Sequence, residues 1–238
     1  MKHKTTSNEV NKKKIKFDIL TIFPEMFPAY FGASMMKRAQ ENNHIEVNIH
    51  NLRDFAKDKH KMTDDVAYGG ISGMVMKVEP VYYAVNSIKK KNKKDKVRVL
   101  VTSAKGKVMN QKKVRSLSKH DRIILIAGHY KGIDERVAKY IADEEISIGE
   151  YIITGGELST MVIVDAVSRM ISGVIGKDES KKGESFSSGV KHEHPVYTRP
   201  EVFSPENDKD WKVPEILLSG HHQKISEWRS KNRKNQSK

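Results

Sequence analysis

The sequence of 238 residues contains no cysteine. Without thiols a chain forms no disulfide, no thiolate zinc site and no iron–sulfur cluster, and it has no cysteine nucleophile. We therefore do not expect a disulfide-stabilised secreted protein or a thiol-based redox enzyme.

Long apolar runs and several familiar motifs are also missing. No apolar run approaches the roughly 18 residues of a membrane span, and Met1–Lys16 lacks the apolar segment of a signal peptide. The chain has no G-x-x-x-x-G-K-[ST], no G-x-G-x-x-G after a predicted strand and no G-x-S-x-G. These absences predict a cytoplasmic protein that contacts no membrane, and they disfavour P-loop hydrolysis, a standard dinucleotide fold and an α/β-hydrolase.

Acidic residues are outnumbered by basic ones. The chain has 44 Lys and Arg against 30 Asp and Glu, which gives a formal net charge of +14 at pH 7. Such an excess favours a polyanionic partner, because each phosphate that Lys or Arg neutralises releases condensed counterions. Lysines that merely keep the surface soluble explain the charge equally well, so composition leaves both interpretations open.

From residue 16 onward, short apolar runs rich in Ile and Val alternate with segments of helical periodicity. The runs predict strands at Lys16–Phe23, Ile45–Asn51, Val97–Thr102, Arg122–Ala127 and Glu145–Ile148. The periodic segments predict helices at Glu25–Gln40, Pro80–Lys91, Gln111–Leu117, Ile133–Tyr140 and Glu157–Met170. This alternation predicts an α/β fold with a parallel sheet.

Other segments interrupt or flank this pattern. The polar segment Leu52–Lys77 reads as a long loop, and such loops are usually functional or mobile. Residues 1–15 read as a basic N-terminal arm, and 16–172 as the α/β domain. Residues 173–204, with several Gly and Pro, read as a flexible interdomain linker. Two short helices, Val213–Leu218 and His221–Arg229, are expected in the remainder, 205–238.

Glycine-containing turns follow three of the predicted strands or precede a predicted helix. They are Thr102–Gly106, Ala127–Gly132 and Ile153–Glu157. Open α/β sheets bind ligands beyond the carboxyl ends of their strands, and glycine lets the backbone approach a ligand closely. Any one of these turns could merely reverse the chain, but three together favour a ligand site.

Histidine clusters give no metal site. His192-Glu193-His194 and His221-His222 do not have the spacing of a helical zinc site. We therefore predict no metal ligands, and we expect these side chains on the surface or in the linker.

Nine stretches of the chain resemble a known family. They are Phe23-Pro24-Glu25-Met26-Phe27, Arg53-Asp54-Phe55, Asp64-Asp65-Val66-Ala67-Tyr68-Gly69-Gly70, Gly132-Ile133-Asp134-Glu135-Arg136, Ile148-Gly149-Glu150-Tyr151, Gly155-Gly156-Glu157-Leu158, Asp165-Ala166-Val167-Ser168-Arg169, Tyr197-Thr198-Arg199-Pro200-Glu201-Val202 and Leu217-Leu218-Ser219-Gly220. Together, and in this order, they resemble the bacterial tRNA (guanine-N1)-methyltransferases of the TrmD family.

The resemblance implies a particular fold and assembly. It implies a SPOUT-type parallel sheet whose carboxyl half threads a deep trefoil knot, which ordinary connection rules exclude. It also implies a truncated C-terminal helical domain that binds tRNA, at 205–238, and a homodimer in which each site is shared between subunits.

The resemblance also implies a cofactor, S-adenosylmethionine, held by the knot loops. The positions carried over are Val101, Thr102, Ser103, Gly128, Tyr130, Ile148, Tyr151, Ile153, Gly155, Gly156 and Leu158. Their backbone groups are expected to bind the adenine, with the apolar side chains beside it.

The implied substrate is the guanosine immediately 3′ of the tRNA anticodon, position 37. Guanine N1 carries a proton at neutral pH, so methylation there needs a general base and a cation near O6. By family position the base is Glu184 and the cation is Arg169. Without the resemblance, residue type alone would predict a solvated loop carboxylate at Glu184 and a surface charge or salt-bridge partner at Arg169.

Two departures from the family pattern keep alternatives open. The family usually has Asp at Glu184, and it usually has Glu at Lys131, a position associated with magnesium. Lys131 therefore leaves Mg²⁺ dependence open. The alternatives are a divergent homologue that methylates a different RNA nucleoside, and one that binds cofactor and RNA with little catalysis.

Overall fold

The structure is a computed structural model, and it describes residues 14–70, 72–176, 184–186, 192–206 and 208–235. Most of the predicted basic arm and parts of the predicted linker, 177–183 and 187–191, lie outside the described residues. The chain divides into two compact units, 1–176 and 177–238, and each is described here by itself. The predicted α/β domain, 16–172, falls within the first unit.

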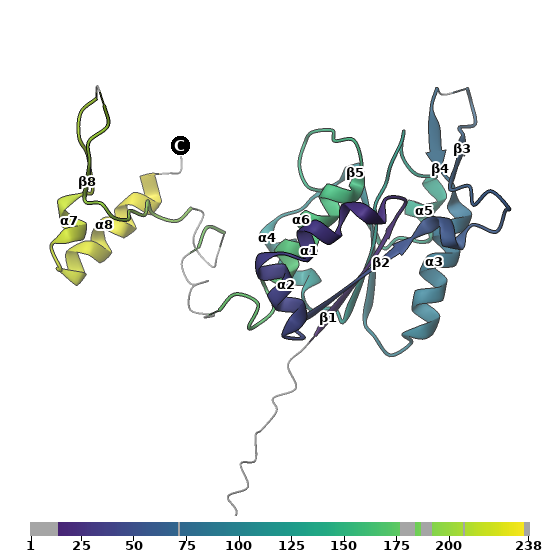
Figure 1. Ribbon diagram of the computed structural model, residues 1–238, viewed down its shortest axis with the longest axis horizontal. Helices are drawn as coiled ribbons and strands as arrows, with labels where there is room; N and C mark the ends of the chain where they lie inside the picture. The colour runs from purple at the N-terminus through teal and green to yellow at the C-terminus, as the bar shows by residue number, and fades with distance from the viewer. Residues whose placement is uncertain (1–13, 71, 177–183, 187–191, 207, 236–238) are drawn as a thin grey trace, which may run out of the picture. The chain divides into compact units, whose positions relative to one another are not determined.

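The first unit is built on a five-stranded sheet (Figure 1). Its strands are β1 Ile15–Thr21, β2 Ile45–Asn51, β5 Val97–Val108, β6 Arg122–Ile126 and β7 Glu144–Ser147. They lie in the order β2-β1-β6-β5-β7, and each neighbouring pair is parallel. The prediction of an α/β fold with a parallel sheet is confirmed. The knot stays a prediction.

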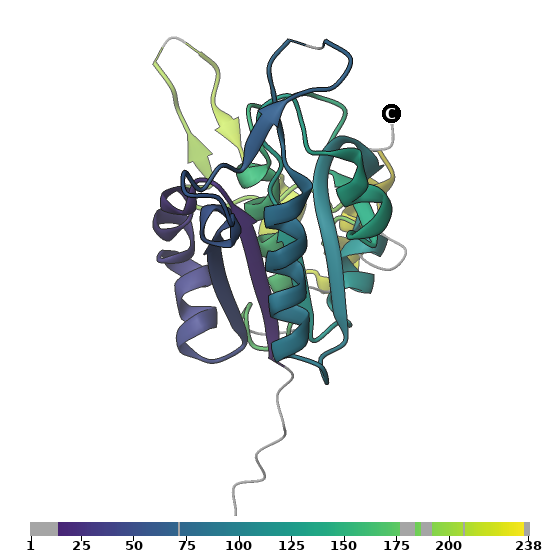
Figure 2. The same ribbon diagram turned by 90° about the vertical axis from the view of Figure 1, so that its right-hand side faces the viewer.

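Side chains that alternate along the central strands fill two cores, one on each face of the sheet. Along β6, Ile123 and Leu125 join the core that contains helix α6, Gly156–Ser168, whereas Ile124 and Ile126 join the core that contains α3, Val78–Lys91. Successive residues of a strand point to opposite faces, so a strand covered on both faces is a nearly continuous apolar run. All five residues of β6 are buried, and helices lie on both sides of the sheet (Figure 2).

The predicted helix Glu25–Gln40 is wrong as a single element. The structure has a 3-10 helix, η1 Pro24–Met26, followed by α1 Pro28–Phe31 and α2 Ser34–Glu41. Pro28 has no backbone N–H to donate to a preceding turn, so a new helix starts there, and Gly32 ends it. The other helices follow the prediction more closely: α4 is Gln111–Leu117, and α5 is Glu135–Tyr140.

The predicted loop Leu52–Lys77 is more ordered than expected. It begins with a 3-10 helix, η2 Leu52–Phe55, and forms a hairpin from β3 Asp64–Val66 and β4 Met74–Met76. Three-residue strands are too short to give a periodic pattern, so the sequence carried no signal for them.

The second unit contains a hairpin and two helices. The helices are α7 Glu215–Leu218 and α8 His222–Asn235, close to the two predicted ones. The hairpin pairs β8 Val202–Phe203 with β9 Trp211–Lys212, and the sequence analysis missed it.

Candidate functional site

The first of the three predicted turns is a bulge within β5. Thr102 and Lys107 both pair with Ile146 of β7, so residues 103–106 loop out of the ladder between them. A Cβ on Gly106 would lie 2.6 Å from the backbone nitrogen of Ile146. Only glycine fits there, and the bulge is therefore held close against the neighbouring strand.

The second turn follows β6 and is tied to the first. The Thr102 hydroxyl donates to the carbonyl of Ile126 (3.2 Å) and accepts from the backbone N–H of Gly128 (3.3 Å). Tyr130, at φ 59°, takes the left-handed backbone conformation that non-glycine residues seldom adopt. The side chain of Thr102 thus fixes where this turn leaves the sheet.

The third turn precedes α6 and lies against the other two. The backbone N–H of Gly156 donates to the carbonyl of Gly128 over 2.6 Å. A Cβ on Gly156 would collide with Thr102 Oγ1 and would lie 2.6 Å from the nitrogen of Gly128. Such a close approach of three backbone segments is available only to glycine.

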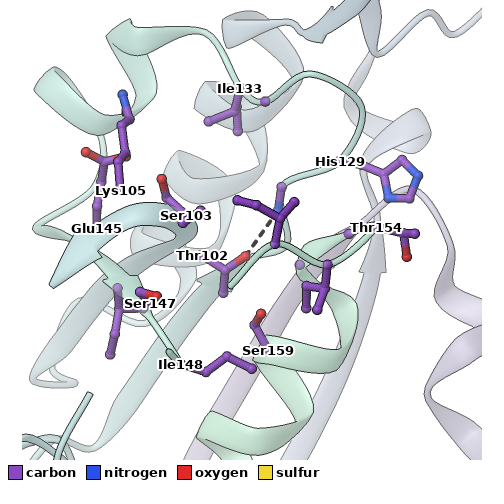
Figure 3. Close-up of a pocket in the computed structure, with 18 of the residues that line it drawn as sticks. Thr102, Ser103, Lys105, His129, Ile133, Glu145, Ser147, Ile148, Thr154 and Ser159 are labelled. Atoms are coloured by element: carbon purple, nitrogen blue, oxygen red, sulfur yellow. Dashed lines mark hydrogen bonds and ion pairs between the residues drawn. The ribbon is translucent and has the colours of Figure 1, made fainter. Parts of the chain in front are cut away.

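The three turns surround a cavity of about 480 Å³ (Figure 3). Nine of the eleven predicted cofactor residues line it: Thr102, Ser103, Gly128, Tyr130, Ile148, Tyr151, Ile153, Gly155 and Gly156. The remaining two lie outside the lining. Val101 is fully buried in the core beneath the cavity, and Leu158 is 53% exposed on α6.

The cavity is lined by both apolar and polar side chains. Ile133 and Ile148 lie on opposite sides of it in Figure 3, and the hydroxyls of Ser103 and Ser159 come from different elements. Several lining residues, among them Ile133, Ala138, Glu145 and Ser159, were not predicted. Ala138 and Ser159 come from helices α5 and α6, Glu145 from β7, and Ile133 from the segment before α5. Nothing in the sequence marks such residues as facing a turn from another part of the chain.

Charged side chains at the cavity are largely paired with one another. Lys105 forms ion pairs with Glu135 and, over 3.8 Å, with Glu145. The hydrogen bond with Glu135 raises the pKa of Lys105, against the opposing effect of partial burial. Lys131 also lines the cavity, and its stem packs on Gly73 of the β3–β4 hairpin. Apart from Lys105, Lys131, Glu135 and Glu145, no Lys, Arg, Asp or Glu is among the lining residues.

Arg169, one of the two predicted catalytic residues, is not among the residues that line the cavity. Arg169 comes directly after α6, where its backbone N–H donates to the carbonyl of Asp165 (3.1 Å). Glu184 belongs to the second unit, whose position relative to the first is not determined. Their catalytic roles stay predictions.

Two features are absent from the part of the chain that the structure describes: a cluster of metal ligands and a helix that could span a membrane. Within the described ranges, no three His, Asp or Glu side chains gather as metal ligands. None of the helices described is both long and apolar enough to cross a bilayer.

Comparisons with known proteins agree with the site. A family profile described as tRNA (Guanine-1)-methyltransferase TrmD matches residues 15–238. A tRNA (guanine-N(1)-)-methyltransferase of Dehalococcoides mccartyi is 48% identical over 217 residues, which are 91% of this chain and 85% of that protein. One from Carboxydothermus hydrogenoformans is 50% identical over 217 residues, covering 91% and 82% of the two chains.

A solved structure is similar as well. The crystal structure of tRNA (m1G37) methyltransferase from Aquifex aeolicus superposes with a TM-score of 0.75 at 39% identity, and covers 94% of this chain and 91% of that one. This likeness supports the predicted SPOUT-type sheet. The profile, the identities and the shared fold lead to one conclusion: the chain belongs to the TrmD family of tRNA (guanine-1)-methyltransferases.

Proposed function

We propose that this chain transfers a methyl group from S-adenosylmethionine to N1 of the guanosine 3′ of the anticodon, position 37 of tRNA. The observation that carries the proposal is the cavity enclosed by the three turns, in a chain of the TrmD family. The net charge of +14 suits an RNA substrate.

The residues of the cavity fit the donor. Its volume of about 480 Å³ lies within the roughly 300–1,000 Å³ of small-molecule sites. Ile148 and Ile153 offer apolar surface for a planar base, and residues of all three turns line the cavity around it. When bound, S-adenosylmethionine supplies an electrophilic methyl group on a sulfonium.

Residues of all three turns would hold the donor. The backbone of Thr102 to Ser103 and of Gly128 to Tyr130 would bind its polar edges, and Ile148, Tyr151 and Ile153 would cover its faces. The third turn, at Gly155 and Gly156, closes the cavity against α6.

Proton removal and charge stabilisation fall to two side chains. Glu184 takes the N1 proton of guanine, because the protonated nitrogen has no lone pair to offer the methyl group. Arg169 stabilises the negative charge that then spreads to O6. Lys131, a cation, does not ligate a metal ion, so we propose that this position takes no part in binding Mg²⁺.

A second copy of the chain is the proposed partner of α6. Leu158 and Val162, four residues apart on one face of this helix, are 53% and 45% exposed, although most of the helix is buried. An apolar helix face open to water is typical of an interface. We propose a homodimer with sites shared between subunits.

The experiment is a methylation assay with purified protein, S-adenosylmethionine and a tRNA transcript with guanosine at position 37. Mass spectrometry of the digested RNA should find N1-methylguanosine there, and a transcript with adenosine at this position should remain unmethylated. Glu184→Gln should lower kcat by at least about a hundredfold, as expected for loss of a general base, with donor affinity unchanged. Full activity of that variant excludes Glu184 as the base, and a methyl group on another nucleoside supports the first alternative. Adding EDTA tests the need for Mg²⁺ directly.

A further inference from the structure

A buried acid lies behind the cavity wall. Glu157, the second residue of α6, is 1% exposed, and each of its carboxylate oxygens has a partner. Oε1 accepts a hydrogen bond from the Thr21 hydroxyl (2.9 Å), and Oε2 lies 3.4 Å from Nδ1 of His129. Burying a carboxylate costs several kcal/mol unless it is paired, so these contacts are needed for the acid to stay where it is.

The direction of each hydrogen bond follows from its neighbours. The Thr21 hydroxyl accepts from the backbone N–H of Phe23 (2.9 Å), so its own hydrogen points to Glu157. The carboxylate also lies at the amino end of α6, which favours negative charge. A carboxylate only accepts, so the nitrogen of His129 that faces it carries the hydrogen. In the neutral ring this leaves Nε2 without one.

The pair straddles the third turn. A Cβ on Gly155 would collide with both Glu157 Oε2 and His129 Nδ1, so the turn packs directly on the two groups. The His129 ring also meets Phe23 and Tyr130 edge-on, with ring centroids 4.8 and 5.1 Å away. The second and third turns are thus joined by this side-chain contact as well as by the hydrogen bond between Gly156 and Gly128.

We propose that Glu157 is a positioning residue for the donor cavity. Its carboxylate holds His129 with Nδ1 protonated, and the pair fixes the Gly128 turn against the Gly155–Gly156 turn before the donor binds. A cavity formed in advance saves the ordering cost of binding. This inference rests on the proposed function, because it assumes that the donor occupies the cavity.

Two substitutions of His129 distinguish the roles of its two ring nitrogens. Asn places an amide N–H near the position of Nδ1, whereas Gln places its amide near Nε2. We expect His129→Asn to bind S-adenosylhomocysteine within about threefold of the unchanged protein by calorimetry. His129→Gln and Glu157→Gln should each weaken it about tenfold or more, the scale of one hydrogen bond to a charged group. Affinity for tRNA should remain unchanged.

The matched control is Glu150→Gln, the same chemical change on an exposed side chain outside the cavity lining. It should leave the affinity for S-adenosylhomocysteine unaltered. A nitrogen-15 NMR experiment gives an independent readout: His129 should be the Nδ1–H tautomer in the unchanged protein, and Glu157→Gln should shift it toward Nε2–H. If Glu157→Gln does not fold, Thr21→Val, which removes only one of the two contacts, is measured in the same two ways and should show a smaller loss.

The outcomes separate this inference from the proposed function. An unchanged protein that binds neither S-adenosylmethionine nor S-adenosylhomocysteine overturns both. Normal donor binding together with an Nε2–H tautomer of His129, or with equal affinity in Glu157→Gln, overturns the positioning role alone.

Discussion

The two ends of the parallel sheet are built in opposite ways. At the amino end, Arg122 and Asp18 form an ion pair in which both side chains are at most 5% exposed, and Arg122 also bonds Asp95 (2.8 Å) and Asn92 (2.8 Å). The other carboxylate oxygen of Asp18 lies 2.7 Å from His50 Nε2. At the carboxyl end, glycine turns enclose a cavity, and they are joined by the main-chain hydrogen bond between Gly156 and Gly128 and by side-chain contacts of Thr102 and His129.

The contrast separates stability from binding. Charges buried at the amino end have partners and fill the space, so this end holds the strands together and leaves no room for a ligand. At the carboxyl end a cavity replaces close packing, and close contacts between the turns hold the cavity in shape. Substitutions at the two ends should therefore change different measured quantities.

The largest effect is expected from breaking the buried pair. Arg122→Met leaves the carboxylate of Asp18 buried without its cation, which should lower the free energy of unfolding by about 3–5 kcal/mol. Urea denaturation measures this loss. Donor affinity, measured where the variant is still folded, should be unchanged, and a variant that lost donor affinity while keeping its stability would contradict the division between the two ends.

At the other end, Gly156→Ala should affect binding most. The added methyl group collides with Thr102 Oγ1 and pushes the third turn away from Gly128. We expect donor affinity to fall about a hundredfold, or ~2.7 kcal/mol, as calorimetry would detect. Gly176→Ala is the control, because a Cβ there meets no atom within 4 Å. Unaltered affinity in Gly156→Ala would show that the turns need not touch.

A smaller effect is expected at Glu144, the first residue of β7. Partial burial would raise the pKa of its carboxyl, but hydrogen bonds from Lys113 and Arg98 outweigh it and lower the pKa below the ordinary 4.5. Glu144→Gln should cost about 1 kcal/mol of stability at pH 7. Because the pKa is lower in the folded state, this contribution is present above pH 4.5 and is lost as the pH falls through the folded value. Unfolding curves of the two proteins should converge in acid, and a constant difference would contradict the ionic origin.

The smallest effect is expected from Lys105 at the carboxyl end. Its ion pair with Glu135 is well exposed, with 60% and 67% of the two side chains accessible. Exposed pairs contribute little, so Lys105→Met should change the free energy of unfolding by less than about 0.5 kcal/mol. A loss near that of Arg122→Met would remove the contrast between the two ends.

Sequence reasoning found the sheet because its strands are covered on both faces. The apolar run Ile123–Ile126 is typical of a strand buried on both faces, and its alternation with helical segments then predicted the fold class. It failed between Glu25 and Gln40, where helical periodicity persists across Pro28 and Gly32 although the backbone breaks there. It also missed two-residue strands such as Val202–Phe203, which depend on pairing rather than on pattern.

The site was predictable to the extent that it consists of consecutive residues. Gly128 and Gly156 were noticed because glycines after strands are visible in the sequence. Glu157 marked a turn and a helix start in the sequence, but no role in the site could be predicted for it, since its link to Thr21 joins residues 136 positions apart. Contacts between residues so far apart in the sequence depend on the tertiary fold, and no local sequence pattern predicts them.

The bulge in β5 has a consequence for how this chain can change. Residues 103–106 are anchored on both sides, because the strand pairs with Ile146 before and after them. Deleting or inserting one residue would turn Lys107 and Val108 to the opposite faces of the sheet or break their pairing with β7. Side chains in this segment can therefore be exchanged, except at Gly106, while its length is fixed. Variation among descendants of this sequence should appear there as substitution and not as insertion.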